Sequence, residues 1–370
     1  MTEKAKSRTS LSPGQAIFSI CSILALVLSF VCSDALLESM KRGMQLCVTT
    51  VLPSLFPFAV LSELTVRSGA ADGVARLFGR AFEKLFGIRR EGAIALVLGL
   101  LCGFPIGTRS AISLYERGKL SRGELERLLC FCNGPSPAFL VGAVGVSLFG
   151  SREFGFLLLV AELVSCLAVG ILLRWLFGKG GELSSGACVN PCPRRLGACE
   201  HITLAVSESA KSMISVCSFI IFFSAFGGVI RACLDTLRVP DGAMALVMGA
   251  LELTGGALAV SKLDPPLSCL LCAAVVGWSG LSVHFQLISI CGEHKIRLGR
   301  YFCAKLCRAA IDVSVVAVGM RIFDGKIVIS EGAAESFLHS GRMSALGVFS
   351  LFLFAIGALG LCRREKVRKK

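Results

Sequence analysis

Two ionisable side chains stand out because they interrupt stretches that are otherwise apolar enough to lie in a membrane. Glu252 falls in the middle of the stretch 242–261, just ahead of a Thr-Gly-Gly sequence, and Arg109 closes the stretch 92–108. A charged residue at the centre of a membrane helix costs at least about 2.5–3.5 kcal/mol, so its presence predicts a function. We expect Glu252 to carry a coupling proton or to ligate Na⁺, and Arg109 to hold a carboxylate with its forked guanidinium.

Structural roles for buried charges are the alternative. Glu252 could instead pair with Arg109 or with a hydroxyl, and Arg109 could extend to the membrane surface. Two further acids, Glu162 and Asp312, lie in apolar stretches without a neighbouring helix break. We expect these two acids to satisfy polar contacts between helices.

Short polar side chains beside predicted helix breaks suit the binding of a small polar ligand. They are Asn133, Ser136, Ser279 and Ser282. The same side chains could equally cap helices or form hydrogen bonds between helices. His284 and Gln286 lie two residues apart, so they would face the same ligand only if their segment were unwound.

Glycines and prolines break the apolar stretches at four places. The predicted break residues are Gly103, Pro105, Gly107, Pro135, Pro137, Gly255, Gly256 and Gly280. Backbone groups freed by a break in hydrocarbon must be satisfied by protein or by cavity water. In secondary transporters, broken helices form the central site, where helix N-termini face anions and free carbonyls hold cations. The breaks therefore predict a transporter with a central binding site.

The elements that must position these residues are membrane helices. The 370-residue chain is 54% hydrophobic and 17% charged, with a mean hydropathy of +0.74. Runs without Asp, Glu, Lys or Arg reach the roughly 18–20 residues that cross a bilayer at 9–33, 43–62, 128–151, 212–230, 265–292 and 343–362. Weaker candidates are 92–108, 154–173, 242–261 and 309–320. We predict an all-α polytopic integral membrane protein with about 8–10 crossings, an internal repeat and re-entrant helices.

The net charge of +14 indicates orientation in the membrane and not nucleic-acid binding, because the basic residues lie between the apolar runs and at both ends. By the positive-inside rule both termini are cytoplasmic. Basic loops 67–91 and 291–308 then fall inside, but the basic segment 109–127 falls outside. This conflict predicts that either 92–111 or 128–150 is a re-entrant hairpin.

Three other stretches have two interpretations each. The run 16–32 resembles a signal peptide, but its length and the poor cleavage site that follows favour an uncleaved span. The stretches 74–87 and 293–306 mix apolar and basic residues at helical spacing. They are expected to be helices on an anionic membrane surface or plain connecting helices.

A faint duplication organises the chain. The sequence GAIALVLGLL at 92–101 matches GAMALVMGAL at 242–251 at seven of ten positions. Helix breaks follow both matches at corresponding places. We predict one transmembrane domain over 16–362, with repeats at about 43–178 and 207–322, a tail at 1–15 and a basic tail at 363–370.

The eighteen cysteines are mostly scattered through apolar runs, where cysteine behaves as a small hydrophobe. Cys188, Cys192 and Cys199 share a polar loop with His201. Their spacing matches no common structural zinc template, so a metal, a disulfide and free thiols all remain open. We expect no metal and no cofactor. No nucleophile–His–acid set is apparent, so we expect no enzyme.

Three motifs resemble a known family in order and spacing. They are Leu-Pro-Ser-Leu-Phe-Pro-Phe at 52–58, Cys-Gly-Phe-Pro-Ile-Gly at 102–107 and Phe-Cys-Asn-Gly-Pro-Ser-Pro-Ala-Phe at 131–139. They resemble the sporulation integral membrane proteins of endospore-forming bacteria (YlbJ-like). This resemblance, over about 40–320, implies the nucleoside-recognition or Gate fold shared distantly with concentrative nucleoside transporters. It also implies transport of dipicolinic acid across the outer forespore membrane. The Thr-Glu-Ala-Pro signature of true nucleoside carriers is absent.

We therefore expect a permease for a small organic anion, most concretely dipicolinate, that works by alternating access at the broken helices. The alternatives are a non-transporting sporulation scaffold and a nucleoside-type transporter. The expected partners are the lipid bilayer, a small anionic substrate and a coupling ion, H⁺ or Na⁺. Nucleic acid is excluded, and a homo-oligomer is compatible with the sequence.

Overall fold

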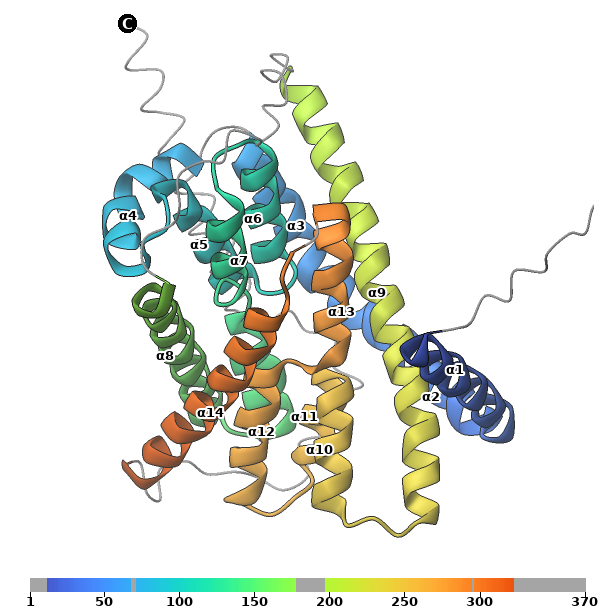
Figure 1. The fold of residues 1–370 in the computed structure, drawn as a ribbon. Coiled ribbons are helices and arrows are strands. Elements are labelled where there is room, and N and C mark those ends of the chain that lie inside the picture. The colour runs from blue at the N-terminus through green and yellow to red at the C-terminus, as the bar shows by residue number, and fades with distance from the viewer. Residues whose placement is uncertain (1–11, 68–70, 178–196, 295, 323–370) are drawn as a thin grey trace, which may run out of the picture.

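The computed structural model describes residues 12–67, 71–177, 197–294 and 296–322, and this part of the chain is built from helices (Figure 1). The α-helices, in chain order, are α1 Pro13–Val31, α2 Ser33–Leu46, α3 Leu52–Arg67, α4 Ala71–Phe86, α5 Ala93–Cys102, α6 Ile106–Glu116, α7 Arg122–Leu129, α8 Arg152–Phe177, α9 Ala198–Thr236, α10 Asp241–Leu251, α11 Leu253–Val260, α12 Leu267–Trp278, α13 Gly280–Cys291 and α14 Gly299–Ile322. Two π-helices, η1 Cys47–Val51 and η3 Ala138–Leu148, and short 3₁₀ turns at Arg90–Gly92 and Gly292–His294 complete them.

Within the described residues, four helical stretches are long and apolar enough to cross a membrane. They are Pro13–Val31, Arg152–Phe177, Cys199–Thr236 and Leu267–Cys291, the last made of α12 and α13 together. The predicted all-α polytopic membrane fold is therefore confirmed. The predicted span 343–362 lies outside the described residues.

Two pairs of short helices fold back on themselves as hairpins. In hairpin 1 (α5 and α6), a Cβ added to Gly99 would lie 3.2 Å from the Cα of Gly107. In hairpin 2 (α10 and α11), a Cβ added to Gly256 would collide with the backbone of Gly249. Because glycines lie where the arms touch, the backbones approach closely. Of the two stretches predicted to form a hairpin, 92–111 and 128–150, the former folds back on itself, and its re-entry into the membrane stays a prediction.

Hairpin 2 corrects the count of crossings. The stretch 242–261 was expected to be one of about ten membrane segments, but it turns back at Glu252, whose backbone is extended at φ −145° and ψ 132°. Each arm is too short to cross a bilayer, because α10 has 11 residues and α11 has 8. The apolar composition alone could not distinguish a hairpin from a crossing.

Two further helices are interrupted without folding back. Residues 130–137 separate α7 from η3, and Ser279 separates α12 from α13. Each hairpin tip lies against one interruption: a Cβ on Gly103 would be 2.7 Å from the Ser136 nitrogen, and one on Gly280 would be 2.9 Å from the Leu253 nitrogen. A hairpin followed by an interrupted helix thus occurs twice in the same order. The bounds of the predicted repeats stay a prediction.

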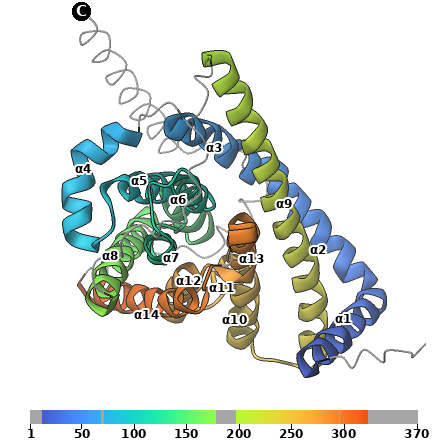
Figure 2. The same cartoon turned by 45° about the horizontal axis from the view of Figure 1, so that its top comes forward.

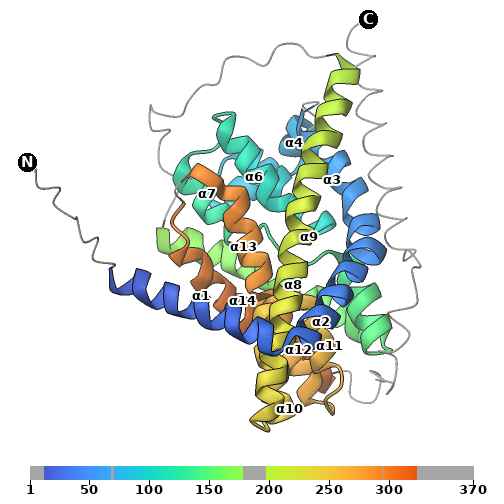
Figure 3. The ribbon, with the colours of Figure 1, turned by 90° about the vertical axis from the view of Figure 1, so that its right-hand side faces the viewer.

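The remaining helices surround this centre. Helix α14 packs against both α8 and α12, and Figure 2 shows these three on one side of the molecule, opposite α9 and α2, which pack on each other. Helix α1 has no buried residue and projects from the body in Figure 3. The amphipathic stretch 74–87 is confirmed as a helix, α4, which buries Phe82 and Phe86.

One predicted loop is wrong. The basic stretch 291–308 was expected to be a cytoplasmic loop, with a surface or connecting helix over 293–306. Instead α14 begins at Gly299 and buries Tyr301, Ala304, Lys305 and Arg308 within its first turns. The sequence predicted that this stretch is exposed to solvent, because charged residues are usually solvated. In the structure, Lys305 and Arg308 lie instead on the inner face of a packed helix.

Candidate functional site

One face of α14 carries three charged side chains into the protein interior. Lys305, Arg308 and Asp312 are spaced by three and four residues, so they lie on the same side of the helix. Their exposed fractions are 0%, 0% and 1%. With Glu162 of α8, which is 2% exposed, they form what we term the buried charge cluster. Buried charges are costly unless paired or hydrogen-bonded, so each contact of the cluster matters.

Lys305 connects the two helix interruptions. Its Nζ donates to the main-chain carbonyl of Asn133 at 3.0 Å and to the Ser279 hydroxyl at 3.0 Å. The ammonium also lies 4.8 Å from the centre of the Phe104 ring, at the tip of hairpin 1. These partners are all neutral, and Lys305 forms no ion pair within the described residues.

Arg308 joins the same carbonyl to an acid. Its Nη1 donates to the Asn133 carbonyl at 2.5 Å, and its Nη2 forms an ion pair with Glu162 Oε1. A Cβ on Gly134 would collide with that Glu162 oxygen and lie 3.1 Å from Arg308 Nη2. Glycine at 134 therefore leaves the space in which the ion pair forms.

Asn133, predicted to bind substrate through its side chain, is at the cluster but presents its main chain. Its Oδ1 accepts from the Thr108 hydroxyl at 2.7 Å, and its Nδ2 donates to the Leu129 carbonyl at 3.1 Å. These bonds fix the side chain against α6 and α7. The carbonyl freed by the interruption is what meets the two cations, as expected for unwound backbone at membrane depth.

Ser279, also predicted to bind substrate, lies at the cluster. It has a left-handed backbone conformation, at φ 76° and ψ −5°. Its hydroxyl donates to the Val276 carbonyl at 3.1 Å while accepting from Lys305. The interruption between α12 and α13 thus supplies a polar side chain to the cluster.

Glu252 has a local structural role that its position in the sequence did not indicate. It precedes α11, and its carboxylate accepts from the backbone N–H of Thr254 at 2.9 Å and of Gly255 at 2.6 Å. It is therefore the N-cap of α11. Its predicted pairing with Arg109 does not appear among these contacts, whereas the predicted pairing with a hydroxyl does, because the Thr254 side chain also hydrogen-bonds the Glu252 carboxylate.

Several predicted break residues lie inside helices and not at the breaks. Gly255 and Gly256 belong to α11, and Gly107 belongs to α6. The backbone turns instead at Glu252 and at Gly103, whose φ is 78°. The prolines Pro105, Pro135 and Pro137 do precede helices or lie in the interruption, and Gly280 opens α13 with φ 78°. Gly107 and Gly256 allow two backbones to approach closely, and a glycine in that role looks like a helix break in the sequence.

Arg109 lies apart from the buried charge cluster in its contacts. Its Nη1 donates to the main-chain carbonyl of Glu208 in α9 at 2.9 Å, and its Nη2 lies 3.7 Å from the Glu208 carboxylate. The Arg109 side chain is 23% exposed. The expectation that Arg109 is the basic residue facing a ligand finds no support in these contacts.

The other polar candidates satisfy local bonds. The Ser136 hydroxyl accepts from the Phe139 nitrogen at 3.2 Å and so begins η3. The Ser282 hydroxyl accepts from Gln286 Nε2 at 3.3 Å. His284 Nδ1 lies 2.8 Å from the Tyr301 hydroxyl. His284 and Gln286 are both buried on a regular helix because α13 is enclosed on several sides.

Glu162 makes the interhelical ion pair expected of it, whereas Asp312 has the Ser165 hydroxyl of α8 beside it but forms no ion pair among the described residues. Neither carboxylate oxygen of Asp312 has a hydrogen-bond partner among the described residues, and the same is true of Glu162 Oε2. Asp312 is packed closely, since a Cβ on Gly277 of α12 would lie 2.5 Å from its Oδ2. Asp312 is thus a buried acid without an ion pair among the described residues.

Lys305 and Arg308 are the residues that the sequence interpretation missed. Their spacing of three residues, followed by Asp312 four residues later, is the signal that could have identified them. In α14 this spacing places all three on one face.

The cysteine loop contributes little to the described structure. Cys188 and Cys192 lie outside the described residues, and Cys199 is an exposed free thiol. Across residues 12–67, 71–177, 197–294 and 296–322, no group of three or more His, Cys, Asp or Glu is arranged to hold a metal ion.

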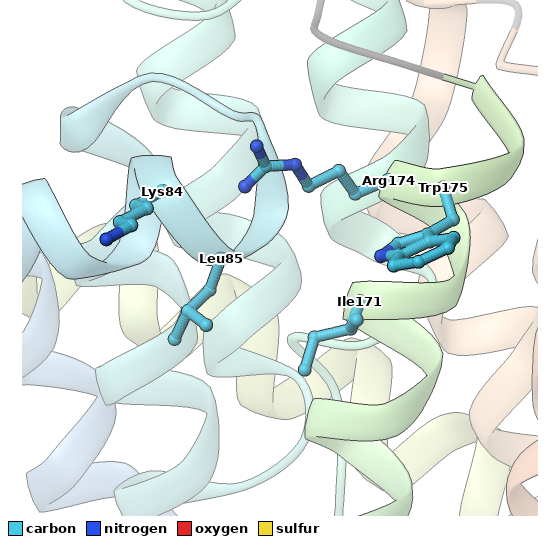
Figure 4. Close-up of a pocket in the computed structure, with 5 residues that line it drawn as sticks. All are labelled: Lys84, Leu85, Ile171, Arg174 and Trp175. Carbon is cyan, nitrogen blue, oxygen red and sulfur yellow. The ribbon is translucent and has the colours of Figure 1, made fainter.

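A separate surface pocket of about 460 Å³ lies between α4 and α8. Lys84 and Leu85 line it from α4, and Ile171, Arg174 and Trp175 line it from α8 (Figure 4). None of these residues belongs to the buried charge cluster.

Comparison with known proteins assigns the family. The sporulation integral membrane protein YlbJ of Bacillus subtilis (strain 168) is 30% identical over 306 residues, or 74% of each chain. No family model and no solved structure matches the chain, and the link to the nucleoside-recognition fold stays a prediction. The likeness seen in the three sequence motifs is confirmed at this identity and coverage: the chain belongs to the YlbJ-like family of sporulation integral membrane proteins.

Proposed function

We propose that this sporulation membrane protein is a permease for a small organic anion, most concretely dipicolinate, in the outer forespore membrane with both termini cytoplasmic. The observation that carries the proposal is Lys305, a fully buried ammonium held between two helix interruptions. The choice of dipicolinate comes from the family resemblance, and the preference for an anion comes from the side chains.

The chemistry of Lys305 favours a carboxylate ligand. Its partners in the described structure are a carbonyl, a hydroxyl and an aromatic ring, none of which carries a full negative charge. A carboxylate makes shorter and stronger hydrogen bonds with an ammonium than neutral acceptors do. A ligand carboxylate that replaced the Ser279 hydroxyl would therefore gain a charge-assisted bond in a low-dielectric interior.

The surroundings suit a flat aromatic dianion. Arg308 lies next to Lys305 on the same carbonyl, and although its Nη2 pairs with Glu162, its Nε has no hydrogen-bond partner among the described residues and could donate to a second carboxylate. Phe104 offers a ring at the tip of hairpin 1, and aromatic rings pack well against one another in offset or edge-to-face arrangements.

Access requires movement, because Lys305, Arg308, Asn133 and Ser279 are fully buried. The hairpin tips are placed to provide it, since each lies directly against an interruption. Movement of one hairpin at a time would open the cluster to one side of the membrane and then the other, as alternating access requires.

Reconstituted transport tests the proposal. Proteoliposomes would be assayed for uptake of labelled dipicolinate by the unmodified protein, by Lys305→Met and by the matched control Lys211→Met. Lys211 is an exposed lysine paired with Glu208. We expect uptake by the protein and the control, and at least about a tenfold loss in Lys305→Met, the equivalent of one charge-assisted bond.

The proposal fails if the unmodified protein moves dipicolinate no faster than empty vesicles do. It also fails if Lys305→Met is monodisperse, melts at the temperature of the unmodified protein and still transports normally.

A further inference from the structure

We propose that Asp312 takes up a proton when the anion binds at Lys305, so that the permease couples anion movement to proton movement. This inference rests on the function proposed above and adds the coupling ion and its carrier. Glu252, the residue expected from sequence to carry that ion, is engaged in capping α11.

The first observation is the isolation of the Asp312 carboxylate. It is 1% exposed, and neither oxygen accepts a hydrogen bond from the described residues. Ser165 lies beside it, but the Ser165 hydroxyl donates to the Glu162 carbonyl at 3.1 Å. An ionised carboxylate in such a place depends on the nearby charges of Arg308 and Lys305, so it takes up a proton readily when negative charge is added beside it.

The second observation is the set of charges that faces Asp312. From its own helix these are Arg308 and Lys305, and from α8 they are Glu162 and the Cys166 thiol. The nearest part of α12 is Gly277, and the titratable side chains of that helix are Cys269 and Cys272. Arg308 is committed to Glu162, so Asp312 is the carboxylate left without a partner.

Charge balance then links the proton to the anion. Two cations and two ionised carboxylates give the empty cluster no net charge. An arriving carboxylate adds negative charge to a buried site of low dielectric, which disfavours every ionised acid nearby. A proton transferred from solvent to an Asp312 oxygen offsets one of the two negative charges that a dianion brings, and it leaves again when the anion departs.

A proton fits this position better than Na⁺. A sodium ion would lie next to the like charges of Lys305 and Arg308, which repel it. A proton bound to a carboxylate oxygen is neutralised within the group and needs no further ligands.

Proton uptake on binding tests the inference directly. Dipicolinate would be titrated into the purified full-length protein by calorimetry in buffers of different ionisation enthalpy, with NaCl varied in a second series. We expect uptake of about one proton per anion bound, independent of Na⁺. Asp312→Asn should bind the anion with no uptake, and Glu252→Gln should bind it with the normal uptake.

The outcomes separate the two proposals. Absence of dipicolinate binding by the unmodified protein would overturn the permease and the coupling together. Binding without proton uptake, or uptake that persists in Asp312→Asn, would overturn the coupling alone. Uptake lost in Glu162→Gln and kept in Asp312→Asn would also overturn it, by assigning the proton to Glu162. If Asp312→Asn does not fold, proton uptake by the unmodified protein on dipicolinate binding still tests whether anion binding is coupled to a proton.

A second inference rests on the surface pocket alone. We infer that the pocket between α4 and α8 binds an anionic phospholipid, with its headgroup at Lys84 and Arg174 and an acyl chain along Leu85 and Ile171. Figure 4 shows the Arg174 side chain extending from α8 toward α4, with Leu85 and Ile171 below it. The Arg174 guanidinium thus lies above apolar side chains, as a phospholipid headgroup lies above its acyl chains, and the Lys84 ammonium points away from α8 in this view.

The position of the pocket and the charge of the residues that line it support an anionic phospholipid as the occupant. Arg174 and Trp175 lie in the last turn of α8, which spans Arg152–Phe177 and is long enough to cross the membrane. Trp175 is 84% exposed, and tryptophan is typical of the membrane interface. Neither Lys84 nor Arg174 forms an ion pair within the described residues, so both charges are available to a lipid phosphate.

Trp175 provides its own probe, because the chain contains two tryptophans. In Trp278→Phe, Trp175 is the remaining fluorophore. We expect brominated phosphatidylglycerol to quench it more than brominated phosphatidylcholine does at equal mole fraction. The difference should vanish when Lys84→Gln and Arg174→Gln are added, and it should persist with Arg231→Gln, an exposed arginine on α9.

Equal quenching by the two lipids in Trp278→Phe would overturn the inference. Selective quenching that survives loss of both Lys84 and Arg174 would overturn it as well.

Discussion

Lys305 and Ser279 connect α14 to the interruption between α12 and α13, since the ammonium donates to the hydroxyl at 3.0 Å. The same ammonium donates to Asn133, which is 172 residues away in sequence. One side chain therefore holds both interruptions together. Any opening of the protein at either interruption must stretch or break one of these two bonds.

The ion pair between Arg308 and Glu162 should be strongly coupled. Loss of one partner from a buried pair costs about 3–5 kcal/mol because it leaves the other charge unpaired. We expect Arg308→Met to lower the free energy of unfolding by that order. The double variant Arg308→Met with Glu162→Gln should recover part of it, as SDS titration in mixed micelles can measure. Strictly additive losses in the double variant would contradict the pairing.

Arg109 should be nearly dispensable. Its pair with Glu208 is partly exposed, with the two side chains 23% and 36% accessible, and such pairs contribute less than about 1 kcal/mol. We expect Arg109→Ala to unfold at close to the normal detergent concentration and to keep dipicolinate uptake. Loss of uptake in a folded Arg109→Ala protein would return this arginine to the substrate path.

Gly134 should not tolerate a side chain. An added Cβ would collide with the Glu162 carboxylate in its ion pair with Arg308, so Gly134→Ala should destabilise the protein by about 1–3 kcal/mol, as overpacking does. Gly123→Ala is the matched control, because nothing lies within 4 Å of its added Cβ. Since Gly123 is within α7, alanine there should be neutral or stabilising by up to about 1 kcal/mol. Melting temperatures of the two variants compare them directly.

Glu252 should behave as a helix cap. Its two bonds to backbone N–H groups are lost in Glu252→Ala, which should cost about 0.5–2 kcal/mol. Glu252→Gln keeps one acceptor oxygen and should cost less. Transport by Glu252→Gln should have the same dependence on pH as the unmodified protein. A flattened pH profile in this variant would mean that Glu252, and not Asp312, carries the proton.

The sequence predicted where helices are interrupted better than it predicted which residues surround the interruptions. Proline and glycine act on the local backbone, so the interruptions near Pro105, Pro135 and Gly280 were identifiable without knowledge of the fold. Gly256 lies inside α11, and a glycine that admits a neighbouring helix looks the same in sequence as one that ends a helix; Gly255 lies beside the carboxylate that caps α11.

The charges were harder to interpret, because their surroundings depend on distant parts of the chain. Lys305 and Arg308 follow a basic stretch that resembles any cytoplasmic loop, and their partners Asn133 and Glu162 lie 146 or more residues earlier. Arg109 and Glu252 had the more conspicuous positions in apolar sequence. Glu252 caps its own helix and Arg109 pairs with a partly exposed acid, so neither lies in the buried charge cluster.

At position 279, the left-handed backbone conformation favours glycine for stability, whereas the contact with Lys305 favours serine. A left-handed conformation at φ 76° strains any residue with a Cβ by on the order of 1 kcal/mol, and glycine would relieve that strain. Glycine would also delete the hydroxyl that holds the Lys305 ammonium. Directed evolution for thermal stability alone should therefore drift toward glycine at 279, and a more robust but less active protein would be its product.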